Sequence, residues 1–231
     1  AKVVGWNFAE FFQRMAPISL PVLGAGLFTC WCLEKLRWFG YGARLPKPVR
    51  RVLEEFADNP FLPKFYQNPQ KYAFHVELSF MASRYQQLTS KLPYQNLFKT
   101  FTLADYYFSK SLLFAKITLS EQEYLLYRQI FNIIYKSIPK PDLYVYLHQN
   151  VDHLMQNIQQ RGRTYEMNLT SAYLKQLERE YFNYLKQQKG MRILILDTNN
   201  LDFVNNSSDY DAIKSFLFNK EHPLGISRHI F

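Results

Sequence analysis

Acidic side chains stand directly after three short apolar runs, where carboxylates can take part in catalysis. Glu54 follows VRRVL, Asp105 follows FKTFTLA, and Asp197 follows MRILIL. If these runs are parallel strands of one sheet, their carboxyl ends meet at one edge, which is where such sheets bind ligands. A carboxylate there can orient an attacking hydroxyl, and a second can help to hold magnesium during phosphoryl transfer. The plainer interpretation is that loops begin with polar residues, and the spacing alone leaves both open.

Two arginines separated by one glycine add a second element of the same chemistry. The stretch QQRGRTYE contains Arg161 and Arg163 at the predicted end of a helix. Forked guanidinium groups match the oxygens of a phosphate well. An isolated surface pair would mean little, but together with strand-end carboxylates the pair favours a phosphoryl-transfer site.

Hydrophobic periodicity predicts the elements that must position these residues. Apolar side chains in residues 71–92 recur at steps of three and four, which is typical of a helix. Ser120 and Glu123 form a capping box at the start of a further helix, and Gly190 closes another. Strands that alternate with helices predict an α/β domain whose mostly parallel sheet is covered on both faces. The predicted helices span 71–92, 120–138, 150–160, 170–188 and 208–218, and the predicted strands lie within 97–106, 141–147 and 191–200.

The charge of the chain is unevenly distributed. The formal net charge is +9 at pH 7, but residues 1–52 hold eight of the 28 Lys and Arg and only two of the 19 Asp and Glu. Residues 53–231 are therefore close to neutral and lack the basic stripe that duplex binding needs, so we expect no nucleic-acid partner. All three Trp, both Cys and five of the eight Gly also precede residue 53. This shift predicts a boundary between an atypical segment, 1–52, and a domain, 53–231.

Two features of the N-terminal segment bear on where the protein works. Cys30 and Cys32 are too close together for an easy disulfide and too few for a metal quartet, so we expect a reducing, cytoplasmic location. Residues 15–33 form an uncharged run just long enough to cross a bilayer. Pro17 and Pro21 weaken a helix there. We expect no membrane span, and an anchor that leaves the main body in the cytoplasm stays an alternative.

Four blocks of the chain resemble one enzyme family. They are LEEFADNPFLPKFYQNPQKYAFHVELSFMASRYQQL, DYYFSKSLLFAKITL, PKPDLYVYLHQNVDHLMQNIQQRGRTYE and ILILDTNNLDFVNN. Together they are similar to the deoxynucleoside kinases, in particular the bacterial deoxyguanosine/deoxyadenosine kinase branch, over residues 53–231. The resemblance implies a P-loop-kinase-like fold, with helices flanking a parallel sheet. It also implies magnesium-dependent transfer of the ATP γ-phosphoryl group to the 5′-hydroxyl of a deoxynucleoside, and a homodimer, which family members commonly form.

The resemblance assigns roles around the reacting phosphate. Glu54 takes the place of the carboxylate that acts as general base on the 5′-hydroxyl. Arg161 and Arg163 match the lid arginines that close over the donor phosphates. Asp105 matches the acidic residue of the family's D-R-S or E-R-S motif, for which we expect a magnesium-binding role. Tyr106 stands where the arginine of that motif should follow, so the motif is only partly kept.

The resemblance also assigns four residues to the nucleoside. Tyr66 matches the tyrosine that hydrogen-bonds the sugar 3′-hydroxyl, and Glu166 matches its carboxylate partner. Arg84 matches the arginine near the base and the reacting phosphate. Glu77 stands where the family usually has a glutamine that contacts the base edge. A carboxylate accepts hydrogen bonds without donating any, which favours a base with neighbouring donors, such as guanine N1 and N2.

The family's phosphate-binding loop has no counterpart in this sequence. The pattern G-x-x-G-x-G-K-[ST] supplies backbone amides and a lysine for the donor phosphates and a hydroxyl for magnesium. In VLGAGLFT, Leu27 replaces the lysine and Phe28 the hydroxyl residue, and no Gly-Lys pair occurs anywhere in the chain. We therefore expect the first strand and the phosphate loop to be replaced by the atypical segment.

Three interpretations of segment 1–52 stay open. A shifted reading frame or an unrelated fusion explains the abrupt change in composition best. A natural pseudoenzyme would keep the nucleoside site without the donor site, in a binding or structural role. The third interpretation is a membrane-anchoring segment.

Overall fold

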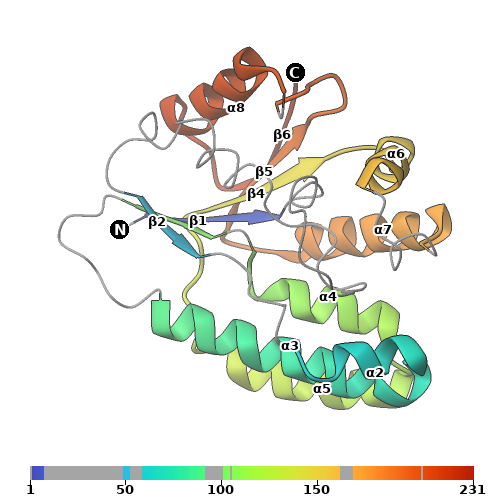
Figure 1. Ribbon diagram of the computed structural model, residues 1–231. Helices are drawn as coiled ribbons and strands as arrows, with labels where there is room; N and C mark the ends of the chain where they lie inside the picture. The colour runs from blue at the N-terminus through green and yellow to red at the C-terminus, as the bar shows by residue number, and fades with distance from the viewer. Residues whose placement is uncertain are drawn as a thin grey trace.

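Six strands form one parallel sheet flanked by helices (Figure 1). The computed structural model describes residues 2–7, 49–52, 59–91, 101–104, 106–161, 169–203 and 205–231. The strands are β1 (Lys2–Asn7), β2 (Val49–Val52), β3 (Phe101–Ala104), β4 (Leu143–His148), β5 (Arg192–Asp197) and β6 (Gly225–Ile230). Their spatial order is β2-β3-β1-β4-β5-β6, and every neighbouring pair runs parallel. The parallel sheet predicted from the alternation of strands and helices is confirmed.

Strand β1 lies in the middle of the sheet, between β3 and β4. Val3 pairs with Thr102 of β3, and Gly5 pairs with Tyr144 of β4. Periodicity did not predict this strand, because six residues that include a glycine carry too weak a pattern. The atypical N-terminal segment therefore supplies the first strand of the sheet.

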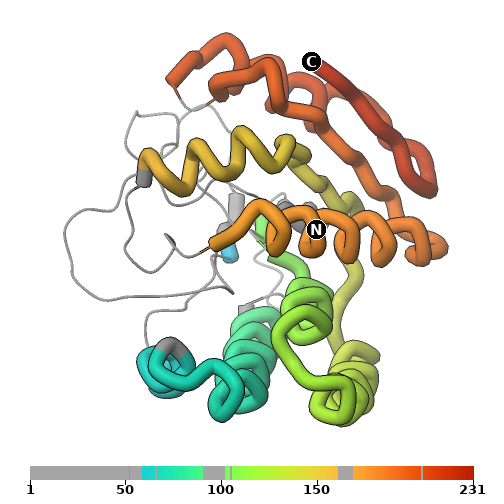
Figure 2. Tube along the Cα trace, turned by 90° about the vertical axis from the view of Figure 1, so that its right-hand side faces the viewer, coloured from blue at the N-terminus to red at the C-terminus, as the bar shows by residue number. Residues whose placement is uncertain are grey.

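Helices cover both faces of the sheet, and a separate hydrophobic core lies on each face. Figure 1 shows α8 on one side of the sheet and α3, α4 and α5 on the other, and Figure 2 shows these last three side by side below α7. The helices are α2 (Leu62–Gln67), α3 (Pro69–Lys91), α4 (Ser109–Thr118), α5 (Glu121–Tyr135), α6 (Val151–Arg161), α7 (Ser171–Gln187) and α8 (Ser207–Asn219).

Strand β4 alternates its side chains between the two cores. Tyr144 and Tyr146 join the larger core with α3, α4, α5 and α7. Val145 and Leu147 join the second core, in which Ile213 of α8 is also buried. Because successive side chains on a strand point to opposite faces, a strand covered on both sides is mostly apolar, as residues 143–147 of β4 are.

The capping box predicted for α5 is present. The Glu123 carboxylate Oε2 accepts hydrogen bonds from the Ser120 backbone N–H at 3.0 Å and from the Ser120 hydroxyl at 2.7 Å. Gly190, after α7, has φ +74°, a conformation that glycine adopts without strain. All five predicted helices are found with shifted ends, whereas α2, α4 and β6 were not predicted as separate elements.

The membrane alternative rested on residues 15–33, which lie outside the described residues. Within the described part of the chain, no helix is long and apolar enough to cross a bilayer.

Candidate functional site

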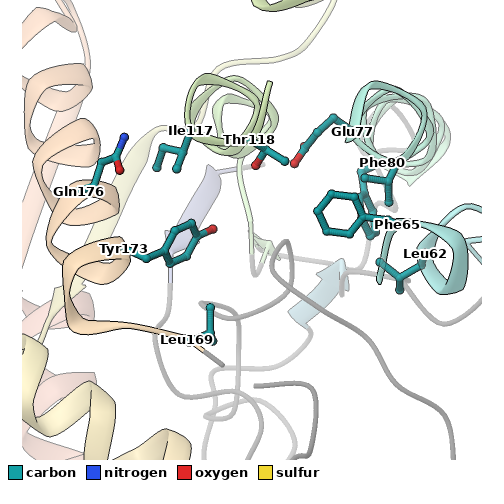
Figure 3. Close-up of a pocket in the computed structure, with 10 residues that line it drawn as sticks. Leu62, Phe65, Glu77, Phe80, Ile117, Thr118, Leu169, Tyr173 and Gln176 are labelled. Carbon is teal, nitrogen blue, oxygen red and sulfur yellow. The ribbon is translucent and has the colours of Figure 1, made fainter. Parts of the chain in front are cut away.

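A cavity of about 320 Å³ lies between α2, α3, the end of α4 and the start of α7 (Figure 3). Four polar side chains line it, namely Glu77, Thr118, Tyr173 and Gln176. The apolar lining residues are Leu62, Phe65, Val76, Phe80, Ile117 and Leu169. A largely apolar cavity with a few polar groups is typical of a small-molecule site.

Glu77 brings a carboxylate into this apolar lining. Only 3% of its surface is exposed. Tyr127 of α5 donates a hydrogen bond to the Glu77 backbone oxygen at 3.3 Å. Burial raises the pKa of the Tyr127 phenol, and the nearby charge of Glu77 raises it further. Burying a carboxylate in such a setting costs free energy unless neighbouring groups or a ligand form hydrogen bonds or ion pairs with it.

Arg84 lies seven residues beyond Glu77 on α3 and is 1% exposed. Its Nη1 donates a hydrogen bond to the Ser111 hydroxyl of α4 at 2.8 Å, and its Cζ lies 5.3 Å from the centre of the Phe80 ring. Lys110, the residue before Ser111, is also buried. Two cations and one carboxylate therefore lie in the apolar region between α3 and α4.

Tyr106, which replaces the arginine expected from the family motif, is fully buried. Its hydroxyl donates a hydrogen bond to Gln87 Oε1 of α3 at 2.6 Å. The side chain is thus neutral and joins the segment before α4 to α3.

Asp197 at the end of β5 takes part in a network of hydrogen bonds. Its carboxylate accepts from Arg228 Nη2 at 2.7 Å and from Asn199 Nδ2 at 2.6 Å, and His148 Nδ1 lies 3.3 Å away. The second ring nitrogen of His148 lies 2.8 Å from Glu178. Burial by itself would raise the pKa of Asp197, but the hydrogen bonds from Arg228 and Asn199 and the charge of His148 outweigh it and lower the pKa. These contacts give Asp197 a structural role at the strand end.

The other predicted site residues are placed only in part. Tyr66 lies in α2 and Arg161 is the last residue of α6, and their side chains are not described. The remaining predicted residues that lie outside the described ranges are Glu54, Asp105, Arg163 and Glu166. Of the predicted set, the structure describes the side chains of Glu77 and Arg84, and both are buried on α3.

A metal ion would need a cluster of suitable ligands. Among the described residues, no group of three or more His, Cys, Asp and Glu side chains is placed to hold one. Asp105, to which the resemblance assigns the magnesium-binding role, lies outside the described residues.

The two α7 residues that line the cavity were not predicted from the sequence. Tyr173 and Gln176 lie three residues apart at the start of α7, the helix that follows the predicted lid arginines in the sequence. An aromatic residue at helical spacing predicts core packing, so periodicity could not mark Tyr173 as a cavity residue.

The chain belongs to the deoxynucleoside kinase family. The profile of that family, described as "Deoxynucleoside kinase", matches residues 44–220. Deoxyguanosine kinase from Bacillus subtilis (strain 168) is 32% identical over 211 residues, which cover 90% of this chain and 95% of the relative.

The fold agrees with this assignment. Deoxyadenosine kinase from M. mycoides, solved with the products dCMP and dCDP, superimposes with a TM-score of 0.64 at 18% identity, over 81% of this chain and 94% of the other. The same enzyme with bound dATP gives a TM-score of 0.64 over 86% of this chain and 96% of the other, also at 18% identity.

The N-terminal part of the chain is similar to a different family. The profile described as "Bacterial Na+/H+ antiporter B (NhaB)" matches residues 1–71. The antiporter NhaB of Marinobacter nauticus is 83% identical over 59 residues, which cover 26% of this chain. The chain spans only 12% of that antiporter's length. The two profile matches overlap at residues 44–71, and the composition boundary at residue 52 falls inside this overlap.

Proposed function

We propose that the cavity binds a purine deoxynucleoside and that the chain is a deoxynucleoside kinase-type protein. The observation that carries this proposal is the buried Glu77 carboxylate on the wall of an apolar cavity of about 320 Å³. Apolar side chains such as Phe65 and Phe80 suit the faces of a base, and the carboxylate suits a base edge that carries donors.

The acceptor chemistry follows from the family resemblance. Glu54 accepts the proton of the 5′-hydroxyl as the hydroxyl oxygen forms its bond to the γ-phosphorus of ATP. The bond from that phosphorus to the β–γ bridging oxygen breaks, which gives a nucleoside monophosphate and ADP. Arg161 and Arg163 stabilise the negative charge on the transferring group, and Asp105 contributes to binding magnesium.

The sugar and the base are held by separate groups in this proposal. Tyr66 and Glu166 bind the 3′-hydroxyl, which orients the sugar in the cavity. Glu77 accepts hydrogen bonds from guanine N1 and N2 and finds no such pair of donors on adenine or thymine. Arg84, whose Nη1 donates a hydrogen bond to Ser111 at 2.8 Å, lies seven residues beyond Glu77 on the same helix.

A second candidate function is nucleoside binding without catalysis. The specific observation in its favour is that no Gly-Lys pair exists among the 231 residues, so the lysine that cradles the donor phosphates is missing. We propose that residues 1–52 are an antiporter-like sequence fused in place of that loop, which the match of residues 1–71 supports. A frameshifted segment and a membrane anchor are the competing explanations.

Two measurements on the full chain separate these functions. Thermal unfolding with deoxyguanosine, deoxyadenosine or thymidine tests binding, because a ligand of the native state raises Tm. Formation of monophosphate from ATP, magnesium and nucleoside tests turnover. Stabilisation with turnover supports the kinase, and stabilisation without turnover supports the binding function. If the chain shows neither stabilisation nor turnover, both functions are contradicted and a structural role is left.

The base preference and the role of Glu54 have their own tests. Comparable phosphorylation rates or equal stabilisation with deoxyguanosine and thymidine would contradict the proposed purine preference. If turnover is detected, Glu54→Gln should abolish it and keep nucleoside-dependent stabilisation.

The resemblance and the composition also bear on the assembly and location of the chain. We propose a cytoplasmic homodimer that has no nucleic-acid partner. Light scattering of the purified chain measures the oligomeric state, and fractionation of expressing cells measures the location.

A further inference from the structure

The start of α7 presents a tyrosine to the cavity. Figure 3 shows the Tyr173 hydroxyl directed into the cavity from the α7 side, with Glu77 on α3 across from it. The backbone N–H of Tyr173 donates to the Thr170 side-chain oxygen at 3.2 Å, which caps the helix. The first turn of α7, in which Tyr173 lies, is therefore capped.

The Tyr173 hydroxyl is well suited to donate a hydrogen bond to a ligand. Burial raises the pKa of this phenol, and the charge of Glu77 raises it further, so the group stays protonated at neutral pH. Within the described part of the chain, no hydrogen bond is found for the Tyr173 hydroxyl or for the Gln176 side chain. A protonated phenol facing a cavity is expected to find its partner in the bound molecule.

The arrangement of Glu77 and Tyr173 matches three neighbouring groups on one base. Guanine carries the N2 amino group, the N1–H and the O6 oxygen in sequence, which are two donors followed by an acceptor. Adenine carries an acceptor at N1 and a donor amino group at the 6-position, so the order is reversed. An acceptor-only carboxylate on one wall of the cavity and a donor phenol on another are complementary to guanine.

We propose that Tyr173 is a specificity-determining residue whose hydroxyl donates to guanine O6 while Glu77 accepts from N1 and N2. This inference rests on the proposed function of the cavity. It adds that a residue of α7, the helix that follows the predicted lid segment, recognises the substituent at the 6-position of the base. Discrimination between guanine and adenine then depends on the distance between α3, which carries Glu77, and α7, which carries Tyr173.

The competing explanation is that Tyr173 only fills space, since its ring also packs against two hydrophobic clusters. Tyr173→Phe separates the two because it keeps the ring and removes the hydroxyl alone. Tyr85→Phe is the matched control, since Tyr85 lies on α3 and is 36% exposed. Urea unfolding of both variants checks that each is folded.

The test is titration calorimetry of the full chain with deoxyguanosine and with deoxyadenosine. For Tyr173→Phe we expect deoxyguanosine affinity to fall about five-fold, the effect of one net hydrogen bond, and deoxyadenosine affinity to change less than two-fold. Tyr85→Phe should change neither. Unchanged deoxyguanosine binding, or equal losses for both nucleosides, would overturn the inference while leaving the proposed function intact. If the wild-type chain binds neither nucleoside, the proposed function fails and this inference fails with it.

Discussion

The guanidinium of Arg84 on α3 donates a hydrogen bond to the hydroxyl of Ser111 on α4, across 2.8 Å. Both residues are almost completely buried. Glu77 lies on the same helix as Arg84, and Thr118 lies on the same helix as Ser111. Because Glu77 and Thr118 both line the cavity, this one bond helps to hold two of its walls together.

Ser111→Ala tests that contact. The substitution removes the acceptor that faces a buried guanidinium, so we expect a loss of about 1–3 kcal/mol in the free energy of unfolding. Urea denaturation measures it. Ser137→Ala, at an exposed hydroxyl whose bond to the Ile134 carbonyl is local, is the control and should cost about 0.5 kcal/mol or less. Equal losses in both variants would show that the Arg84 contact adds nothing.

Glu77→Gln tests the base preference. The amide keeps the size of the side chain but loses the charge and replaces one acceptor oxygen with a donor. We expect deoxyguanosine affinity to fall about ten-fold or more, with a smaller change for deoxyadenosine. Calorimetry measures both, and Glu221→Gln on the exposed surface is the control. An unchanged ratio between the two nucleosides would rule out Glu77 as the group that selects the base.

Asp197→Asn tests the network at the end of β5, through its dependence on pH. The pKa of Asp197 is lowered in the folded chain, so the carboxylate stabilises the fold above its ordinary pKa of 3.8. This stabilisation is lost as the pH falls through the lower, folded-state value. We expect the variant to lose about 1–2 kcal/mol at pH 7, and the difference from wild type to shrink below pH 4.

Urea denaturation at pH 7, 5 and 3 measures this difference. Glu221→Gln at an exposed position is the control and should stay within about 0.5 kcal/mol of wild type at pH 7. A deficit of Asp197→Asn that stays constant from pH 7 to pH 3 would show that the charge of Asp197 does not stabilise the fold.

Ser120→Ala tests the capping box of α5. The variant removes the Ser120 hydroxyl from the first turn of the helix, so we expect a loss of about 1 kcal/mol in the free energy of unfolding. Chemical denaturation followed by circular dichroism measures it. Gln129→Ala, on the exposed side of the same helix, should be close to neutral. A result in which Gln129→Ala costs as much as Ser120→Ala would contradict a specific role for the cap.

The elements that could be predicted from sequence are those with strong local signals. The helix α7 carries buried side chains at Leu174, Leu177 and Tyr181, steps of three and four that stand out in the sequence. Strand β6 could not be predicted, because its residues alternate only between intermediate and exposed positions at the edge of the sheet. Strand β1 is short and gains its place from pairing with β3 and β4, which are distant in the sequence.

Some residues of the candidate site could be predicted from the sequence, and others could not. The resemblance assigned Glu77 and Arg84 to the nucleoside site, and the structure shows that both are buried and that Glu77 lines the cavity. Asp197 shows the limit of that reasoning, because a strand-end aspartate has the same local sequence whether it meets a ligand or an arginine. Its contact with Arg228 joins two strands that the sequence alone does not pair.

The sequence by itself determined the alternation of strands and helices, the caps, the family resemblance and the missing lysine of the phosphate loop. These properties depend on residue type and on neighbours a few positions away. Only the tertiary structure decided that β1 occupies the centre of the sheet, that Asp197 pairs with Arg228, and that Tyr173 faces Glu77 across a cavity. The physical reason is that a contact between distant segments depends on how whole elements pack, and no local pattern encodes that packing.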